Sequence, residues 1–312
     1  MPRKKKGDPV SGWINLNKPA GMTSTQALGK VRRFLNAQKA GHAGTLDPLA
    51  SGVLPIALGE ATKTISFAQD RLKTYRFTVG WGEQRDTDDR EGEIIATSDH
   101  RPSEDQIRAL LPNYTGEIDQ IPPLYSAIKV DGARAYDLAR AGKMPDLKSR
   151  TVYIETLTCL DTRTNDADFE MTCGKGTYVR SLARDMAIDL GTKGYVSALE
   201  RTAVGPFFLK DAISLDKMEQ MDYFSARDEA LRPLQTVLDD IPALSLKQDE
   251  VARLQNGQKL AFISRPDYER LTQEGLGQKG EIVEVLAIYD GAPIALVEAK
   301  GLEIQPVRVF NI

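Results

Sequence analysis

One carboxylate stands out among the side chains that could do chemistry, because the loop around it is built from glycine and proline. Asp47 lies in the segment 41–52, Gly-His-Ala-Gly-Thr-Leu-Asp-Pro-Leu-Ala-Ser-Gly, and the apolar run 53–58 follows it. Glycine allows backbone conformations and close approaches closed to other residues, and Pro48 disfavours a helical conformation at Asp47. The pattern indicates an ordered loop before a buried strand, and it fits either a plain turn or a reactive carboxylate.

The rest of the composition limits the chemistry that this carboxylate could join. The chain has only two histidines, His42 and His100, and two cysteines, Cys159 and Cys173. The cysteines are too few for a disulfide framework or a metal cage, and both fall in strand-like patterns, so we expect small core residues. No dinucleotide or phosphate-loop fingerprint is present. Catalysis is therefore expected to rest on carboxylate, arginine and tyrosine side chains.

Hydrophobic periodicity predicts the elements that would position such groups. In chain order they are a strand from Gly12 to Lys18-Pro19, a helix capped by Thr23 or Ser24, the strand 53–58, a helix over 61–68, a strand over 73–82, a short helix opened by Ser103, a helix over 133–141, and strands over 151–162 and 167–174. From about residue 245, short strands are predicted at 260–262, 282–288, 294–297 and 307–309.

A further helix is predicted after Thr177, which is a good N-cap residue. Its apolar stripe is Val179, Leu182, Ala183, Met186 and Leu190, and Gly191 ends it. Arg180 and Arg184 lie one turn apart and off that stripe, so periodicity alone favours two surface arginines.

Several segments together resemble the TruB family of tRNA pseudouridine synthases. The family's catalytic loop is close to G-H-x-G-T-L-D-P-x-A-x-G-V-L, and every element is present over 41–54. Family patterns also match at 73–75 (K-x-Y), 120–132 (Q-x-P-P-x-Y-S-A-x-K-x-x-G), 176–185 (G-x-Y-x-R-x-L-x-x-D) and 199–207 (L-x-R-T-x-x-G-x-F). The resemblance is strong over about 11–207 and weak beyond.

The resemblance implies roles for individual residues. It implies that Asp47 is the catalytic aspartate, that Arg180 pairs with it, and that Tyr75 stacks on the target base. The residues that it implies contact or order the RNA are His42, Lys18, Lys63, Asp89, Tyr178 and Leu199, with Tyr125 and Lys129 as candidates for lining the RNA channel. Pattern alone leaves ordinary alternatives open, which are a core tyrosine at 75, a core leucine at 199 and solvated lysines.

The acidic turn 86–92 also resembles a family segment, T-D-T-x-D-x-x-G, although Arg85 stands where the first threonine would be. Its clustered carboxylates suit a Ca²⁺ ion in principle, but the full EF-hand pattern is missing. From pattern we favour a solvated turn, whereas the resemblance implies that Asp89 helps to order the site.

The charge distribution bears on partners and compartment. The formal net charge is −3, which by itself argues against nucleic-acid binding, but residues 1–40 carry nine basic side chains against Asp8 alone. No apolar run is long enough to span a membrane, and residues 1–9 lack the apolar core of a signal peptide. With few cysteines, we expect a reduced, cytoplasmic compartment.

The resulting fold prediction is an α+β protein with a mixed, mostly antiparallel central sheet flanked by helices, which is the pseudouridine synthase fold implied by the resemblance. The predicted organisation is a disordered basic tail over 1–10, a catalytic domain over 11–240, and a small β-rich, PUA-like RNA-binding domain over 245–312. The segment 208–240 is expected to be helical and to join the two domains.

The predicted function is isomerisation of the T-loop uridine of tRNA, conventionally position 55, to pseudouridine. The reaction is redox-neutral, so no metal or small-molecule cofactor is expected. The expected partner is the T arm of tRNA, bound by a monomer and away from membranes. Alternatives are a pseudouridine synthase for another RNA and an RNA chaperone that folds tRNA. A glycoside-type hydrolase ranks lower, because no second catalytic acid stands out.

Overall fold

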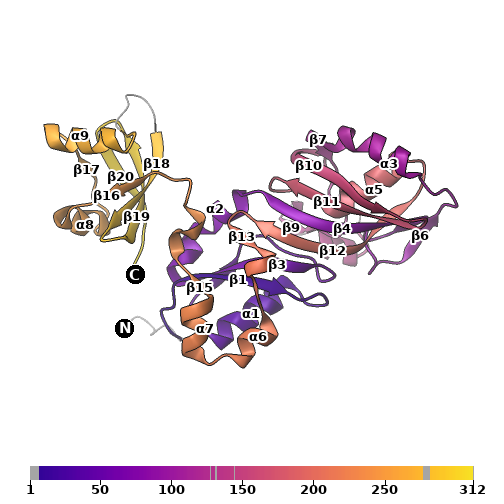
Figure 1. Ribbon diagram of the computed structural model, residues 1–312, viewed down its shortest axis with the longest axis horizontal. Coiled ribbons are helices and arrows are strands. Elements are labelled where there is room, and N and C mark those ends of the chain that lie inside the picture. Colours follow the sequence, from indigo (N-terminus) through magenta and orange to yellow (C-terminus); the bar gives the residue numbers. More distant parts are fainter. Residues whose placement is uncertain (1–6, 127, 131, 144, 277–281, 312) are drawn as a thin grey trace.

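The computed structural model describes residues 7–126, 128–130, 132–143, 145–276 and 282–311. A large mixed sheet of eleven strands forms the body of this part of the chain, and a separate sheet of five strands forms a C-terminal unit beside it (Figure 1). This architecture confirms the predicted α+β class with a β-rich C-terminal domain.

The large sheet places strands from the segments that carry the family resemblance side by side. Along its main path the order is β14 (Ile213–Ser214), β1 (Gly12–Lys18), β3 (Ser51–Leu58), β12 (Gly194–Val204), β4 (Lys73–Trp81), β11 (Asp166–Cys173), β10 (Arg150–Thr162) and β7 (Gly116–Gln120). Off this path, β2 (Ala40–His42) pairs with β3, β13 (Phe207–Phe208) with β12, and β15 (Leu231–Arg232) with β1. The pairs β1–β14 and β12–β3 are parallel and the others antiparallel, as predicted for a mostly antiparallel sheet.

Alternation along each strand explains how both faces of the sheet are covered. On β1, Ile14 and Leu16 belong to the main core, whereas Trp13 points to a second core on the opposite face. The main core is closed by α1 (Ser24–Phe34), α3 (Glu104–Leu110), α5 (Val179–Asp189) and α6 (Leu215–Gln220). On the second core lie the turns η1 (Gly59–Thr64) and η4 (Leu234–Val237), with α2 (Ile65–Asp70) beside them.

Two helix starts show how local chemistry sets the element boundaries. Thr23, one of the two residues predicted to cap this helix, caps α1, and it does so in a reciprocal capping box with Gln26. At α5 the prediction was wrong, because Tyr178 is the N-cap residue and the Thr177 hydroxyl instead donates to the Gly174 carbonyl. The helix predicted over 61–68 is a 3-10 turn followed by α2, so it begins earlier and ends later than periodicity indicated.

The C-terminal unit is less purely β than the sequence indicated. Its strand order is β16 (Ala243–Ser245), β18 (Ile282–Tyr289), β19 (Ala292–Lys300), β20 (Glu303–Val309) and β17 (Leu260–Ala261). Two helices that the sequence did not predict, α8 (Gln248–Gln255) and α9 (Arg265–Gln273), pack with this sheet. None of the helices in the described ranges is long and apolar enough to cross a membrane.

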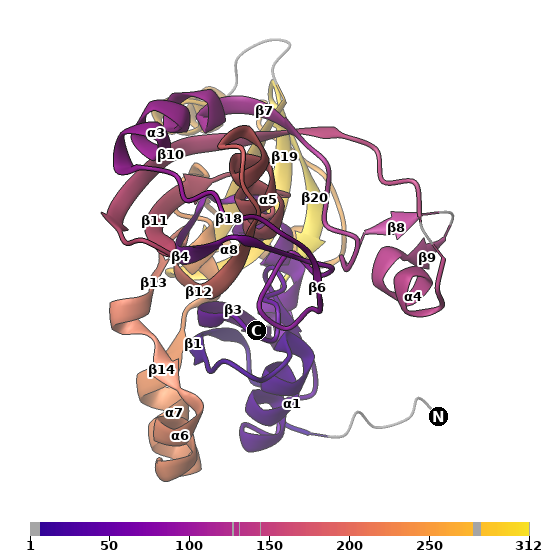
Figure 2. The ribbon, with the colours of Figure 1, turned by 90° about the vertical axis from the view of Figure 1, so that its right-hand side faces the viewer.

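The remaining elements are small. They are the hairpin β5 (Glu83–Arg85) with β6 (Ile94–Thr97), the turn η2 (Leu111–Tyr114), the hairpin β8 (Lys129–Val130) with β9 (Ala133–Arg134), α4 (Ala135–Arg140), η3 (Leu209–Asp211) and α7 (Tyr223–Ala230). β8, β9 and α4 stand off to one side of the body (Figure 2). The segment 208–240 was predicted to be helical. In the structure it contains short helices and also two-residue strands, so the prediction was only partly right.

Part of the segment 1–10, which was expected to be a disordered tail, has fixed contacts in the structure. Residues 1–6 lie outside the described part of the chain, but the next residues are fixed in place. The Asp8 amide donates to the Asn36 carbonyl, and the Asp8 carboxylate accepts the Tyr223 hydroxyl at 3.0 Å. The predicted tail therefore does not extend through Asp8.

Lys63 links the C-terminal unit to the part of the chain that forms the large sheet. Its Nζ lies 2.6 Å from the Val309 carbonyl and 2.6 Å from Glu60 Oε2. Glu60 also accepts the Asn311 amide at 2.9 Å, and Arg308 donates to the Lys63 carbonyl. Phe310 completes the contact by packing in the second core.

Replacing Lys63 with methionine is expected to loosen the C-terminal unit, because the donor to Val309 is lost. A hydrogen bond from a charged group contributes about 1.5–3 kcal/mol, so thermolysin should cut the chain within residues 239–247, which lead from η4 into the C-terminal unit and include its strand β16, at least about tenfold faster. Lys30→Met, which removes an exposed pair with Glu219 at 3.4 Å, should change the cleavage rate less than about twofold. Equal cleavage of both variants would contradict the fastening role.

Candidate active site

A cavity of about 740 Å³ opens at the centre of the large sheet. Strands β4 and β12, the Asp47 loop and the start of α5 all contribute to its wall. Of the predicted site residues, the structure gathers five here, namely Asp47, Tyr75, Tyr178, Arg180 and Leu199. The segments that resembled one family are thus brought together around a single cleft.

The loop that carries Asp47 is held by backbone contacts on two sides. The Ser24 hydroxyl at the start of α1 donates to the Leu46 carbonyl and accepts the Leu46 amide, at 2.9 and 2.8 Å. The Gly21 amide donates to the Pro48 carbonyl at 2.8 Å. The Asp47 carboxylate keeps about a third of its surface exposed, so a rigid loop presents an accessible anion.

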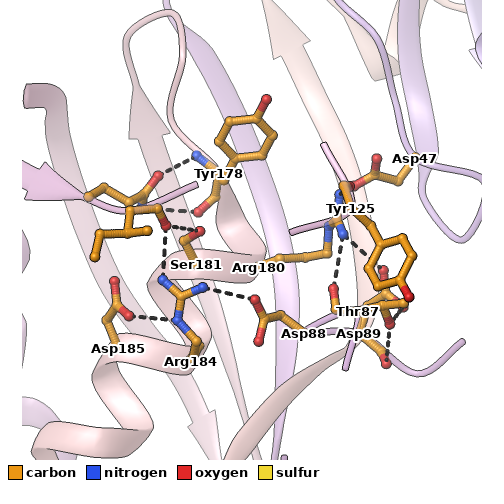
Figure 3. Close-up of polar contacts among 12 residues, drawn as sticks. Asp47, Thr87, Asp88, Asp89, Tyr125, Tyr178, Arg180, Ser181, Arg184 and Asp185 are labelled. Atoms are coloured by element: carbon orange, nitrogen blue, oxygen red, sulfur yellow. Dashed lines mark hydrogen bonds and ion pairs between the residues drawn. The ribbon is translucent and has the colours of Figure 1, made fainter. Parts of the chain in front are cut away.

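Arg180 forms the predicted pair with Asp47. Its Nε lies 2.9 Å from Asp47 Oδ2, and the Nε–H is not directed at the oxygen, so the contact is an ion pair rather than an aligned hydrogen bond. Nη1 donates to the Thr87 carbonyl at 2.9 Å and Nη2 to the Tyr125 carbonyl at 3.0 Å (Figure 3). The side chain is only 4% exposed, so the surface-arginine alternative was wrong here. Buried charges need such partners, and here they also fix the orientation of the guanidinium.

Tyr75 lies on β4 directly opposite Arg201 of β12. Burial raises the pKa of the Tyr75 phenol, while the nearby Arg201, which hydrogen-bonds it, opposes that rise. Arg201 itself donates to the Val53 carbonyl at 2.7 Å and to the Gly44 carbonyl at 3.0 Å. One buried cation therefore connects the phenol to the loop that carries Asp47.

Gly52 shows why this connection needs a glycine. It pairs with Arg201 across the parallel contact of β3 and β12, with φ at +100°. A Cβ atom placed there would lie 2.2 Å from the Arg201 carbonyl oxygen. The close approach predicted for this glycine is therefore between two strands rather than with a ligand.

Three predicted RNA-contacting residues lie away from the cavity wall. Lys18 is fully buried, its Nζ donates to the Pro19 and Met22 carbonyls, and burial lowers its pKa to about 8 although Asp47 opposes that shift. His42 is half-buried on β2, and burial followed by Arg201 lowers its pKa. Lys63 is engaged with the C-terminal unit, as described above. None of the three is among the residues that line the cavity in the described part of the chain.

The acidic turn 86–92 is not a solvated turn, so that prediction was wrong. Asp88 and Asp89 are 5% and 4% exposed, and each faces an arginine of α5. Asp89 Oδ2 lies 3.6 Å from Arg180 Nη1, while its Oδ1 accepts the Thr87 hydroxyl at 2.7 Å. This placement is consistent with the ordering role that the resemblance implied for Asp89.

Tyr178 is anchored to the segment that precedes Tyr125. Its amide donates to Gln120 Oε1 at 2.8 Å, and Gln120 Nε2 donates back to its carbonyl at 3.1 Å. The guanidinium of Arg150 lies 5.1 Å from the centre of its ring. Tyr125 contacts the site through its backbone carbonyl; the side chain of Lys129 lies outside the described residues.

Four cationic residues of the cavity wall were missed in the sequence, namely Lys73, Arg150, Lys175 and Arg201. Burial lowers the pKa of Lys73 to about 8. Lys73 and Arg201 stand at fixed positions of the family patterns K-x-Y and L-x-R-T. The patterns therefore pointed to both residues, but no function was predicted for either of them. Arg150 had no such signal, because its place beside Tyr178 depends on the pairing of distant strands.

The fold with this site is that of a pseudouridine synthase. A chain in the crystal structure of a Cbf5–Nop10–Gar1 complex matches with a TM-score of 0.70 and 26% identity, covering 96% of this chain and 85% of that one. A chain from an H/ACA RNP bound to a substrate RNA containing 2′-deoxyuridine matches with a TM-score of 0.70 at 23% identity, covering 100% and 92%, which shows likeness of fold.

Sequence comparison narrows the class to one family. The model of the TruB family pseudouridylate synthase N-terminal domain matches residues 32–179, and that of the tRNA pseudouridylate synthase B C-terminal domain matches residues 180–242. This chain therefore belongs to the TruB family of pseudouridylate synthases. A relative in Rhodospirillum rubrum is 49% identical over the full length of both chains, and one in Bradyrhizobium diazoefficiens is 53% identical over 97% of this chain and 86% of its own. Both relatives bear the name tRNA pseudouridine synthase B.

Replacing Arg180 with lysine is expected to lower kcat by at least about 100-fold, because a single ammonium cannot hold Asp47 and two carbonyls together. Single-turnover rates on an RNA substrate would measure the loss. Arg108→Lys on α3, where the arginine forms an exposed pair with Glu104 at 2.7 Å, is the matched control and should retain a normal rate. A near-normal rate for Arg180→Lys would show that the planar guanidinium of Arg180 is not needed for catalysis.

Proposed function

We propose that this protein converts a uridine of tRNA to pseudouridine, and that the target is the T-loop uridine, conventionally position 55. The supporting observation is the Asp47–Arg180 pair at 2.9 Å in the wall of a cavity that also contains Tyr75 and Leu199. The relatives named tRNA pseudouridine synthase B support tRNA as the substrate.

The reaction breaks the bond from ribose C1′ to uracil N1 and forms one from C1′ to C5. The hydrogen of C5 leaves as a proton, and N1 gains a proton. Substrate and product are isomers, so no oxidant, reductant or group donor is consumed. Asp47 supplies a negative oxygen that attacks the nucleotide or stabilises a cationic sugar. Arg180 holds this oxygen in place while the base occupies the cavity.

The uridine must leave its stack to reach Asp47, because Asp47 lies in the wall of the cavity. Tyr75 replaces the lost stacking, which is worth about 1–3 kcal/mol for an aromatic side chain. The raised pKa keeps the phenol protonated at neutral pH, so Tyr75 acts by stacking and as a hydrogen-bond donor. Leu199 covers the base from β12.

The RNA backbone is proposed to follow the cations at the cavity wall, including Lys73, Arg150 and Lys175. Lys18 and His42 act from behind the site by supporting the Asp47 loop. The C-terminal unit, over about 245–312, is proposed as a second RNA contact. We also propose that a monomer acts on the T arm in the cytoplasm without a small-molecule cofactor.

The test is incubation with unmodified tRNA transcript, followed by identification and mapping of the product nucleoside. The wild type should form pseudouridine in the T loop, and Asp47→Asn should form none while tRNA affinity stays within about threefold. Asp105→Asn, an exposed carboxylate in the first turn of α3, is the control and should react normally. Appreciable turnover by Asp47→Asn would refute the proposed role of Asp47.

The outcome also separates the other functions. Product only in a different RNA would keep the chemistry and change the substrate. Absence of product in any RNA, with faster tRNA folding by both wild type and Asp47→Asn, would favour an RNA chaperone.

A further inference from the structure

A second arginine of α5 repeats the arrangement of Arg180 one turn further along. Arg184 Nη1 lies 3.0 Å from Asp88 Oδ2, its Nη2 donates to the Ile121 carbonyl at 2.9 Å, and its Nε donates to Asp185 Oδ1 at 2.9 Å (Figure 3). All three sides of the guanidinium are therefore occupied. The side chain is 17% exposed, and it is absent from the residues that line the cavity in the described part of the chain.

The two arginines connect the same pair of segments. Arg180 bonds Thr87 of the acidic turn and Tyr125 of the segment 120–126, and Arg184 bonds Asp88 and Ile121 of the same two segments. Neither segment is a helix or a long strand that would be rigid by itself. Their positions relative to α5 therefore depend on these side chains.

Further contacts concentrate on the same places. The Ile121 carbonyl also accepts the Ser181 hydroxyl at 2.8 Å, so two side chains of α5 share one backbone oxygen. Asp88 adopts φ of +60°, which is uncommon for a residue other than glycine, and its carbonyl accepts the Val196 amide of β12 at 3.0 Å. A strained residue persists only where its surroundings hold it.

We propose that Arg184 is a positioning residue for the isomerisation, because it fixes the acidic turn and the segment 120–126 where Arg180 can hold Asp47. Thr87 and Asp88 are adjacent, so release of the Asp88 carboxylate displaces the Thr87 carbonyl that orients Arg180. Release of Ile121 likewise frees Tyr125, the other carbonyl partner. The kinetic test of this inference rests on the proposed function, whereas the contacts from which it is argued do not depend on that function.

Charge around Asp88 gives the arrangement a dependence on pH. On α5, Asp88 faces Arg184, Arg180 and Asp185. On the acidic turn itself, Asp89 faces Arg180, Asp86 accepts the Tyr125 hydroxyl at 3.5 Å, and Arg90 is exposed. Burial raises the pKa of Asp88 to about 6, although Arg184 and Arg180 pull it down. Below that pH the carboxyl is neutral and the ion pair with Arg184 is lost.

The experiment compares Arg184→Gln, Arg184→Lys and Asp88→Asn with the wild type. Arg184→Gln should lower kcat about 10- to 100-fold with KM changed less than about threefold, because the loss acts through misplacement of Arg180 and not through RNA contact. Arg184→Lys keeps the charge opposite Asp88 but not the full fork, so it should recover part of the rate. The control is Arg163→Gln, which removes a guanidinium facing three aspartates at the β10–β11 turn and should react normally.

The pH profile supplies a readout that a merely structural role would not move. For the wild type, kcat should fall as the pH drops through about 6. Asp88→Asn should not show this fall, because its kcat should already be low at pH 7.5 and should stay low at acid pH. Hydrogen exchange needs no turnover, and residues 86–92 and 120–126 should exchange at least about fivefold faster in Arg184→Gln.

The results distinguish failure of the inference from failure of the proposed function. If the wild type modifies no RNA, the function fails, and hydrogen exchange still tests the positioning role. A kcat within twofold of wild type for Arg184→Gln, or unchanged exchange in both segments, would overturn the inference. If Arg184→Gln does not fold, Asp88→Asn decides, because an unchanged acid limb in that isosteric variant would equally overturn it.

Discussion

The structure depends on burying one guanidinium beside one carboxylate. Arg180 is almost fully buried, and a buried charge is tolerated only when it is paired with an opposite charge and hydrogen-bonded. Asp47 supplies the opposite charge, while the carbonyls of Thr87 and Tyr125 accept the hydrogen bonds of Nη1 and Nη2. The fold must therefore bring three segments that are distant in sequence to the first turn of α5. The large sheet contributes by placing β3, which follows Asp47, beside β12 and β4, on which α5 packs.

The same constraint explains how an acidic chain can present a site for RNA. The formal net charge is −3, but the wall of the cavity carries Lys73, Arg150, Lys175 and Arg201 in addition to Arg180. Most of these side chains are held by backbone carbonyls, as in the Arg201 contacts to Val53 and Gly44. Backbone oxygens satisfy the donors without cancelling the charge. The local field is therefore positive where phosphates would approach, whatever the sum over the chain.

The sequence predicted what is local and misjudged what depends on distant partners. The Asp47 loop, the N-cap of α1 at Thr23 and the alternating strands follow from neighbouring residues, and the structure has them. Periodicity placed Arg180 on the surface because a helical stripe reports only apolar burial, and the partners of Arg180 lie up to 133 residues away, at Asp47. The buried state of Asp88 was missed for the same reason. α8 and α9 were missed because each buries only a narrow apolar edge.

Two arginines, Arg180 and Arg201, control the same carboxylate in different ways. Arg180 contacts the charge of Asp47 directly, whereas Arg201 holds the Gly44 carbonyl and the phenol of Tyr75. Arg201 can do so only because Gly52 lets β3 and β12 approach closely at that point. The anion and the aromatic ring are thus set by one strand contact, while the cation comes from a helix, α5, that packs on β12 and β4. Errors in strand register would separate Tyr75 from Asp47, and errors in helix placement would separate Arg180 from both, so the site forms only when sheet and helix are both correctly assembled.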